Sequence, residues 1–310
     1  MPVPVAPIET QRKVAAYLDE QLSRLDAGVA ALLRAQANLK RYRASVLKAA
    51  CEGRLVPTEA ELARAEGRTF ETGEQLLQRI LAERRERWSG KGKYKEPAAP
   101  DTRALQSLPA GWVWASLDQL FDHVTDGDHQ APPQTDEGIP FLVIGNVRSG
   151  TIDLSDTRFV GQTYYDSLDP RRKPARGDIL YTLVGSYGIA APVETSDRFC
   201  IQRHMAILRP HGLSPARYLA HALGSDLVFK QATGVATGTA QMTVPLAGLR
   251  RIGVGLPPLA EQHRIVAEAD RRLSLIRGAE AQVSANLARA KRLRQSILQA
   301  AFASPGQSFK

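Results

Sequence analysis

The stretch PPLAEQHRIVAEADRRLSLI at residues 257–276 decides the fold, because the chain carries the same pattern near its other end. The segment Pro7–Ala50 matches the segment 251 positions further along the chain without a gap. Fifteen of the 44 aligned positions are identical, among them the pair Asp19 and Asp270. An internal repeat of this kind defines the architecture before any single motif does. The sequence therefore predicts two related segments that bracket a different middle.

Both copies of the repeat predict long helices, which pair as an antiparallel coiled coil. Apolar residues recur every seven positions in each copy, and a second apolar seam runs beside the first. Pro7 and Pro258 precede the copies, at a position where proline costs a helix no internal hydrogen bond. About 45 residues at ~1.5 Å per residue make each helix roughly 65 Å long. The residues expected in the coiled-coil interface are Leu18, Leu22, Leu25, Val29, Leu32, Leu39, Val46, Leu273, Ile276, Val283, Leu287 and Ile297.

A generic structural hairpin is the alternative interpretation of these helices. The apolar seam explains how two rods stay together, and it requires no further role. The length of the rods is the feature that bears on function, because a rod holds attached domains at a fixed distance.

The composition is typical of a soluble protein without a membrane span. Of the 310 residues, 43% are hydrophobic and 24% are charged. No run approaches the ~18 apolar residues of a membrane span, and Met1–Thr10 lacks the pattern of a secretory signal. The two cysteines, Cys51 and Cys200, are isolated, so neither a disulfide framework nor a zinc site is indicated. We expect a cytoplasmic protein without a cofactor or a metal.

The net charge of +9 favours a nucleic-acid partner, but its distribution weakens that inference. Residues 1–108 carry 19 basic and 14 acidic side chains, residues 109–256 carry 13 and 14, and residues 257–310 carry 9 and 4. The positive excess therefore lies on the helical parts, where an acidic protein partner would fit equally well.

Composition divides the chain into five segments, and the fold class is α+β. Residues 1–56 hold the first long helix, residues 57–107 two short helices and a basic linker, residues 108–256 a mixed α/β domain, residues 257–304 the second long helix and residues 305–310 a tail. The short helices are expected at Glu59–Gly67 and Thr72–Trp88. The linker lysines Lys91, Lys93 and Lys95 are able to contact phosphates, although a solvated tether is the commoner role of such a run.

The sequence of the middle domain, residues 108–256, predicts strands that are separated by turns rich in glycine and proline. Three apolar runs predict strands, at Phe141–Val147, Ile179–Val184 and Phe199–Leu208. Arg217–Gln231 is expected to be a helix, and a loop-rich segment from Gly234 to Pro245 leads back to the second long helix.

The sequence offers little support for catalysis. It contains no glycine-rich phosphate loop, no G-x-S-x-G elbow and no methyltransferase motif. Asp126, Asp128 and His129 are close in sequence, and Cys200 and His204 are four apart. These spacings match no familiar metal site or nucleophilic site, and a third partner is missing. Loop polarity and a strand edge explain these residues better.

Recognition of DNA suits the polar residues of the middle domain better than catalysis does. Gln and Arg read adenine and guanine edges bidentately, and Lys and Arg hold phosphates. On a strand, alternation would put Gln202 and His204 on one face and Arg203 on the other. For each residue singly, an ordinary structural role is at least as well supported. The residues expected on or near the DNA face are His129, Gln130, Arg148, Arg171, Arg172, Lys173, Gln202, His204 and Gln241.

Taken together, the motifs resemble the specificity (S) subunits of type I restriction–modification systems. The resemblance covers nearly the whole chain. Its carriers are PPLAEQHRIV and its echo PIETQRKVAAYLDEQLSRLD, then SVLKAACEGRLVP, LPAGWVWASL, GDHQAPP, GIPFLVIGNV, RGDILYTLVGSYG and IQRHMAILRP. Each motif is loose, whereas their order and spacing together are fairly specific.

This resemblance implies a non-catalytic subunit. Such subunits read a split DNA sequence with target-recognition domains joined by an antiparallel coiled coil. They bind the methyltransferase (M) subunits, and the restriction/translocase (R) subunits join that complex. The implied partners are double-stranded DNA, M subunits and R subunits, with no membrane and no cofactor.

The chain departs from the family pattern because it has one recognition domain instead of two. It is therefore expected to be a half-subunit that pairs with a second copy as a homodimer. Two alternatives stay open. One is a protein-interaction scaffold that binds M subunits or other specificity chains without reading DNA; the weaker is a stand-alone nuclease, for which an acidic metal cluster is missing.

Overall fold

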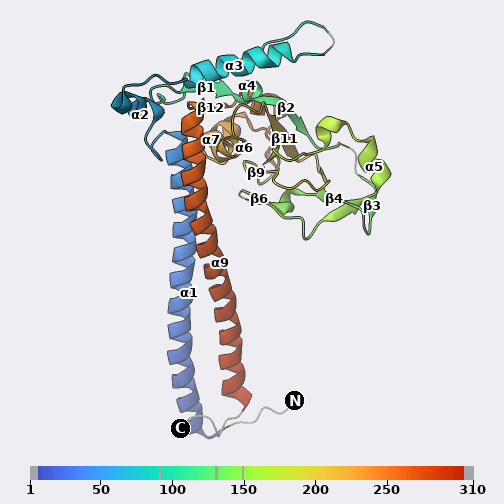
Figure 1. Ribbon diagram of the computed structural model, residues 1–310. Coiled ribbons are helices and arrows are strands. Elements are labelled where there is room, and N and C mark those ends of the chain that lie inside the picture. Colours follow the sequence, from blue (N-terminus) through green and yellow to red (C-terminus); the bar gives the residue numbers. More distant parts are fainter. Residues whose placement is uncertain (1–5, 91, 130–131, 149, 304–310) are drawn as a thin grey trace. The chain divides into compact units, whose positions relative to one another are not determined.

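A computed structural model of the chain describes residues 6–90, 92–129, 132–148 and 150–303 (Figure 1). Its residues group into two units. The first unit comprises residues 1–43 and 271–310, and the second comprises residues 44–270.

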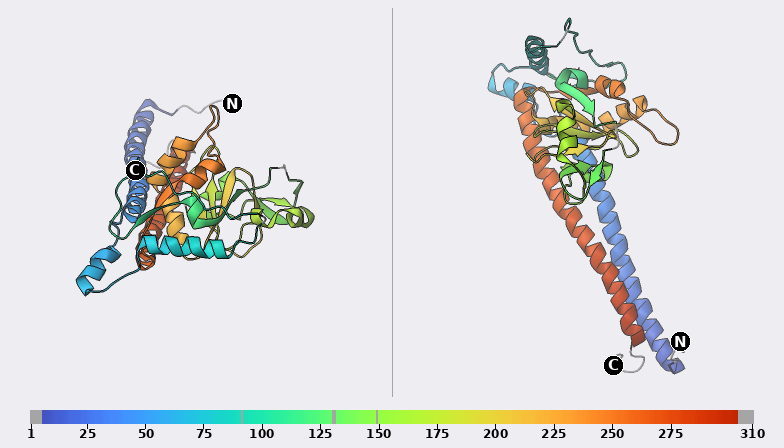
Figure 2. Two further views of the ribbon diagram at one scale, coloured as in Figure 1. Left: turned by 90° about the horizontal axis from the view of Figure 1, so that it is seen from above. Right: turned by 90° about the vertical axis from the view of Figure 1, so that its right-hand side faces the viewer.

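The first unit is an antiparallel pair of helices, as the repeat predicts. Helix α1 (Ile8–Cys51) and helix α9 (Leu259–Ala303) contribute to it, and their ribbons lie side by side in all views (Figures 1 and 2). Arg43 pairs with Glu280 at 2.8 Å and Arg294 with Asp26 at 2.6 Å, which fixes the opposite directions of the helices. The twelve residues predicted for the coiled-coil interface are all buried or half-buried in the structure.

Two short helices open the second unit after α1. Helices α2 (Glu59–Glu66) and α3 (Gly73–Glu86) each begin with a capping box, in which Thr58 or Thr72 exchanges hydrogen bonds with the residue three positions on. Gly67 ends α2 at a φ of 65°, the left-handed conformation that glycine adopts most readily. Both helices predicted from the sequence are therefore present, with ends that differ by at most two residues.

The first and last strands of the middle domain pair with each other. Strand β1 (Val113–Ser116) runs antiparallel to β12 (Gly253–Leu256), directly before α9. The chain thus enters and leaves this domain at neighbouring positions. The domain also contains the helices α4 (Leu117–Leu120), α5 (Gln162–Ser167), α6 (Ala216–Leu223), α7 (Asp226–Val235) and α8 (Leu246–Arg251), and the 3-10 turns η1 (Ile144–Asn146) and η2 (Pro170–Arg172).

Two four-stranded sheets form the body of the middle domain. The first has the order β2 (Phe121–Asp126), β11 (Met205–Pro210), β8 (Ile179–Thr182) and β9 (Ala190–Pro192), with antiparallel neighbours. The second has the order β10 (Cys200–Ile201), β4 (Ile139–Leu142), β7 (Arg158–Val160) and β3 (Gln134–Thr135), in which β10 and β4 are parallel. A hairpin joins β5 (Val147–Arg148) and β6 (Thr151–Ile152). Leu180, Ile207, Leu142 and Phe199 pack in one core that both sheets share.

Three elements expected from the sequence are wrong in their extent. The apolar run Phe141–Val147 is not one strand, because β4 ends at Leu142 and the 3-10 turn η1 occupies Ile144–Asn146. The apolar run Phe199–Leu208 is not one strand, because Arg203 and His204 form a turn between β10 and β11. The helix expected over Arg217–Gln231 is two helices, because α6 ends at Gly224 and Ser225 caps α7 by accepting a hydrogen bond from the backbone N–H of Val228.

Candidate nucleic-acid interface

A polar hollow of about 360 Å³ lies where the end of β2, the turn before β11 and the loop before α8 meet. Three of the residues predicted to face DNA, His129, His204 and Gln241, line it. They come from three segments far apart in the sequence. Asp126 and Arg203 complete the charged part of the lining, and Leu183, Val184 and Val244 are among its apolar residues. We call this the polar hollow.

Gly127 allows the backbone to pass close to the turn that carries His204. A Cβ atom at Gly127 would lie 2.2 Å from the carbonyl oxygen of Ile201, so a side chain has no room there. The backbone N–H of Gly127 donates to the carbonyl of Met205 at 3.3 Å, and the N–H of Met205 donates to the carbonyl of Gln202 at 3.1 Å. These bonds hold the 202–204 turn against the end of β2.

A tight loop presents Gln241 to the polar hollow. Thr237 and Thr243 exchange two backbone hydrogen bonds of 2.8 Å, which closes the loop at its base. The N–H of Gly185 donates to the carbonyl of Met242 at 3.0 Å, so the loop is also fastened to the segment after β8. Gln241 itself is exposed and lines the polar hollow on a backbone that these bonds hold.

The polar hollow combines the Asp126 carboxylate and the Arg203 guanidinium with side chains that form hydrogen bonds. Burial and the neighbouring Arg203 guanidinium lower the pKa of His204, so its imidazole is neutral at pH 7. A neutral imidazole offers one donor and one acceptor. Asp126 lies 3.0 Å from His129 and 3.6 Å from Arg172. The Asp126 carboxylate therefore pairs with one lining residue, His129, and with Arg172, which lies outside the lining.

The basic run Arg171–Lys173 is mostly engaged within the domain. Arg171 forms an ion pair with Asp169 at 2.6 Å. The Arg172 guanidinium donates to the carbonyl of Gly127 at 2.5 Å, beneath the loop that carries His129. Lys173 lies 4.8 Å from the ring centre of Tyr165 and donates to a backbone carbonyl. Of these three residues, only Arg171 lines an open hollow, and that hollow is not the polar hollow.

Two further predicted residues, Arg148 and Gln202, do not line the polar hollow. Arg148 is exposed in the β5–β6 hairpin. Gln202 is half-buried, and its backbone N–H donates to the carbonyl of Leu142 at 2.9 Å. Gln130 lies outside the described residues.

Arg203 is a lining residue that the sequence interpretation placed on the wrong face. Strand alternation separates it from His204, whereas the turn brings both to the polar hollow. Three consecutive polar residues within the apolar run indicate this turn in the sequence, because a turn accommodates polar residues better than a buried strand does.

The structure bears on two of the chemical sites considered from the sequence, a metal site and a nucleophilic thiol. In the part of the chain that the structure describes, no group of three or more His, Cys, Asp or Glu side chains is placed to hold a metal ion. Burial raises the pKa of the Cys200 thiol to about 12 and that of Cys51 to about 11, so both thiols are protonated at neutral pH. Within the described ranges, no helix is both long and apolar enough to cross a membrane.

The chain is similar in sequence to specificity subunits of type I restriction enzymes. No protein-family model matches it. The EcoBI specificity subunit of Escherichia coli is 27% identical over 304 residues, which cover 97% of this chain and 57% of that protein. The EcoKI specificity subunit of Escherichia coli strain K12 is 25% identical over 316 residues, which cover 97% and 56%. The chain thus spans just over half the length of these curated relatives.

The fold also matches a solved structure from such a system. One solved structure concerns complex assembly and conformational transition of the type I R-M system. A chain in it aligns with this chain with a TM-score of 0.55 and 22% sequence identity, and the alignment covers 97% of this chain and 60% of that chain. The resemblance predicted from the motifs is confirmed over nearly the whole chain.

Proposed function

We propose that this chain is a non-catalytic DNA-specificity subunit of a type I restriction–modification complex. Its middle domain reads one half of a split target, and the complex supplies the M and R subunits. The observation that carries the proposal is the convergence of His129, His204 and Gln241 on the polar hollow. These groups hydrogen-bond base edges, they come from fixed loops, and the chain that bears them is similar to specificity subunits.

The proposal also includes a second copy of the chain, which pairs with the first as a homodimer. The two repeat segments keep the same local chemistry: Gln11 and Gln262 each donate from the side-chain amide to the carbonyl five residues earlier. Their surroundings differ. Gln262 is buried and Asp270 binds Arg217 and His221, whereas Gln11 and Asp19 are exposed. In the part of the chain that the structure describes, Asp19 has no hydrogen bond or ion pair.

The second repeat copy contacts the middle domain through Asp270, whereas the equivalent position of the first copy, Asp19, is exposed. In the proposed assembly, the start of α1 receives the middle domain of a second copy, as the start of α9 receives its own. Two-fold dimers of this kind are the commonest oligomers. Each complex then holds two specificity chains and reads an interrupted palindrome.

Methylome sequencing of cells that carry the chain with its M subunit tests the proposal. We expect one methylated motif, made of two identical half-sites related by a two-fold axis. Light scattering of the purified complex should give two specificity chains. A complex that binds the M subunit but methylates no defined motif would instead support the scaffold function, and a non-palindromic motif would exclude the symmetric dimer.

A further inference from the structure

The basic linker that precedes the middle domain is held against that domain. Arg85 binds Glu96 through its Nε at 2.8 Å, and the rings of Trp88 and Tyr94 pack edge to face with centres 5.7 Å apart. The Ser116 hydroxyl donates to the carbonyl of Ala98 at 2.7 Å. The segment 94–98 therefore has a fixed place beside β1 and β2, which a solvated tether would not have.

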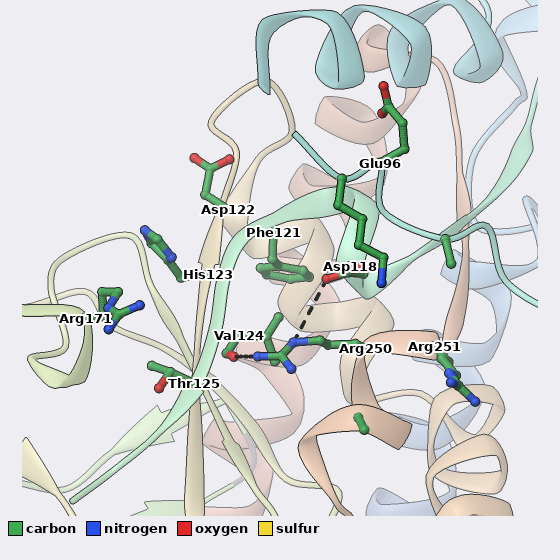
Figure 3. Close-up of a pocket in the computed structure, with 13 residues that line it drawn as sticks. Glu96, Asp118, Phe121, Asp122, His123, Val124, Thr125, Arg171, Arg250 and Arg251 are labelled. Carbon is green, nitrogen blue, oxygen red and sulfur yellow. Dashed lines mark hydrogen bonds and ion pairs between the residues drawn. The ribbon is translucent and has the colours of Figure 1, made fainter. Parts of the chain in front are cut away.

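This placement brings Lys95 into a second hollow, which we call the basic cleft. The basic cleft has a volume of about 600 Å³ and runs along the outer edge of β2. Its cations come from three parts of the chain: Lys95 from the linker, Arg171 from η2, and Arg250 and Arg251 from the end of α8. Figure 3 shows Arg250 between Asp118 and the backbone of Val124, with Arg251 beside it and Arg171 across β2.

Each carboxylate of the basic cleft has a cation within 4.0 Å. Glu96 binds Arg85, Asp122 lies 4.0 Å from Arg84, and Asp118 lies 4.0 Å from Arg250. Lys95 and Arg251, by contrast, are exposed and have no hydrogen bond or ion pair to any residue that the structure describes. Two free cations with strong donors therefore face the basic cleft.

The basic cleft continues the surface of the polar hollow. Residues 121–125 of β2 line the basic cleft, and the next residue, Asp126, lines the polar hollow. On the other side, residues 243–246 line the polar hollow, and Ala247, Arg250 and Arg251 line the basic cleft. The two sites are therefore neighbours along the same two segments.

We propose that the basic cleft binds backbone phosphates of the DNA whose bases face the polar hollow, with Lys95 and Arg251 as the contacting cations. Exposed Lys and Arg donors beside a base-reading surface are the groups that hold DNA in register. The basic cleft adds affinity to every sequence alike and reads none. This inference rests on the proposed function, because it assigns a second contact to the same DNA.

The salt dependence of binding measures these phosphate contacts directly. The complex with the M subunit is titrated onto target duplex and onto unrelated duplex at several salt concentrations. For Lys95→Gln with Arg251→Gln, we expect weaker binding to both duplexes by the same factor. The slope of log K against log salt should fall by about 0.9 for each lost phosphate, or about 2 in total. Arg64→Gln, an exposed cation of α2, is the matched control and should leave the slope unchanged.

A second measurement locates the contacts on the DNA. Duplexes that carry one uncharged methylphosphonate are scanned across the half-site and its flanks. With the parent chain, one or two positions should weaken binding; with the double variant, the same positions should have no further effect. Equal penalties with both proteins would overturn the proposal.

The outcomes separate this proposal from the proposed function. A parent complex without preference for its methylated motif refutes the function, while the salt slope on unrelated duplex still tests the basic cleft. A parent complex with preference, and an unchanged slope in the double variant, refutes the basic cleft alone. A double variant that binds DNA normally but loses the M subunit would assign the basic cleft to a protein partner.

Discussion

At the scale of single residues, the polar hollow makes a prediction about sequence preference. Gln241→Ala and His204→Ala each remove a polar side chain that lines the polar hollow. If the group contacts a base, the substitution should cost about 1–3 kcal/mol on the target and relax one position of the motif. Methylome sequencing of each variant measures this directly.

Matched controls for these variants lie elsewhere on the described surface. Gln134→Ala and His263→Ala remove the same side-chain types from exposed positions outside the polar hollow. We expect both controls to keep the parental motif. If the Gln241 and His204 variants keep it too, the polar hollow does not face the bases.

Trp112 makes a separate prediction about stability. Its indole N–H donates to Glu261 at 3.0 Å, and the same buried carboxylate accepts from the backbone N–H of Glu59 at 2.8 Å. Trp112→Phe leaves a buried acceptor with one partner fewer, which should lower the free energy of unfolding by about 1–3 kcal/mol. Urea unfolding measures the change. Trp114→Phe is the control, because that indole is only half-buried and donates a solvent-exposed hydrogen bond of 3.3 Å to the carbonyl of Gln106. An equal loss in both variants would contradict this account.

The residues of the candidate site were only partly predictable. His129 and Gln241 stand in polar, turn-rich segments, which marks them for exposure without tertiary information, whereas His204 belongs to three polar residues within an apolar run. The partners of the basic run were not predictable, because Arg172 binds a carbonyl 45 residues earlier in the chain. A sequence shows that a cation is present, and only the fold shows whether another group already neutralises it.

At the scale of elements, Asp270 makes a prediction about pH. It lies on α9 and binds Arg217 at 2.5 Å and His221 at 2.9 Å on α6. Burial opposes ionisation, but the hydrogen bonds from His221 and Arg217 outweigh it and hold the pKa of Asp270 below its ordinary value. A depressed carboxyl pKa stabilises the fold above the unfolded-state value of about 4 and loses that contribution as the pH falls through the folded-state value.

Asp270→Asn should therefore cost about 1 kcal/mol at pH 7, and the difference from the parent should shrink below pH 4. Asp19→Asn, at the equivalent position of the first copy, is the control within the same chain. Because Asp19 is exposed and unpartnered among the described residues, its substitution should leave the unfolding of the isolated chain unchanged. Denaturant unfolding across the pH range measures both. An Asp270 effect that does not depend on pH would show that packing, and not charge, is lost.

The elements differed in how well the sequence predicted them. The long helices follow from a heptad pattern sustained over many turns, and α2 and α3 follow from local caps. The strands of the middle domain have two to six residues, and their limits depend on partners far along the chain. The break at Gly224–Ser225 and the turn at Arg203–His204 arise from such packing, which periodicity does not report.

At the scale of the whole molecule, helix length should set the spacing of the DNA target. In the proposed dimer, the long helices separate two middle domains that read identical half-sites. Insertion of four residues after Ala37, with a matching insertion after Ala288, adds about one turn, or roughly 6 Å. Successive base pairs rise ~3.4 Å, so the unread spacer should grow by one or two base pairs while the half-sites stay the same.

Both insertions are needed because the helices pair antiparallel, as the Arg43–Glu280 and Arg294–Asp26 ion pairs show. The chain with only one insertion is the control, and it should lose activity through a shifted register. Methylome sequencing of the parent and both variants gives the spacer lengths. An active double-insertion variant with the parental spacer would contradict the role of the helices.

The pairing of β1 with β12 has a consequence for inheritance. The two ends of the middle domain are neighbours, at Val113 opposite Leu256, and the related helices α1 and α9 lie on either side of the domain in the sequence. A genetic exchange that replaces the DNA between these two points would deliver a complete new domain and leave the helices untouched. The repeated helix segments offer similar sequence on both sides of the exchanged piece. Under the proposed function, one such recombination event would give a lineage a new target sequence without a new assembly.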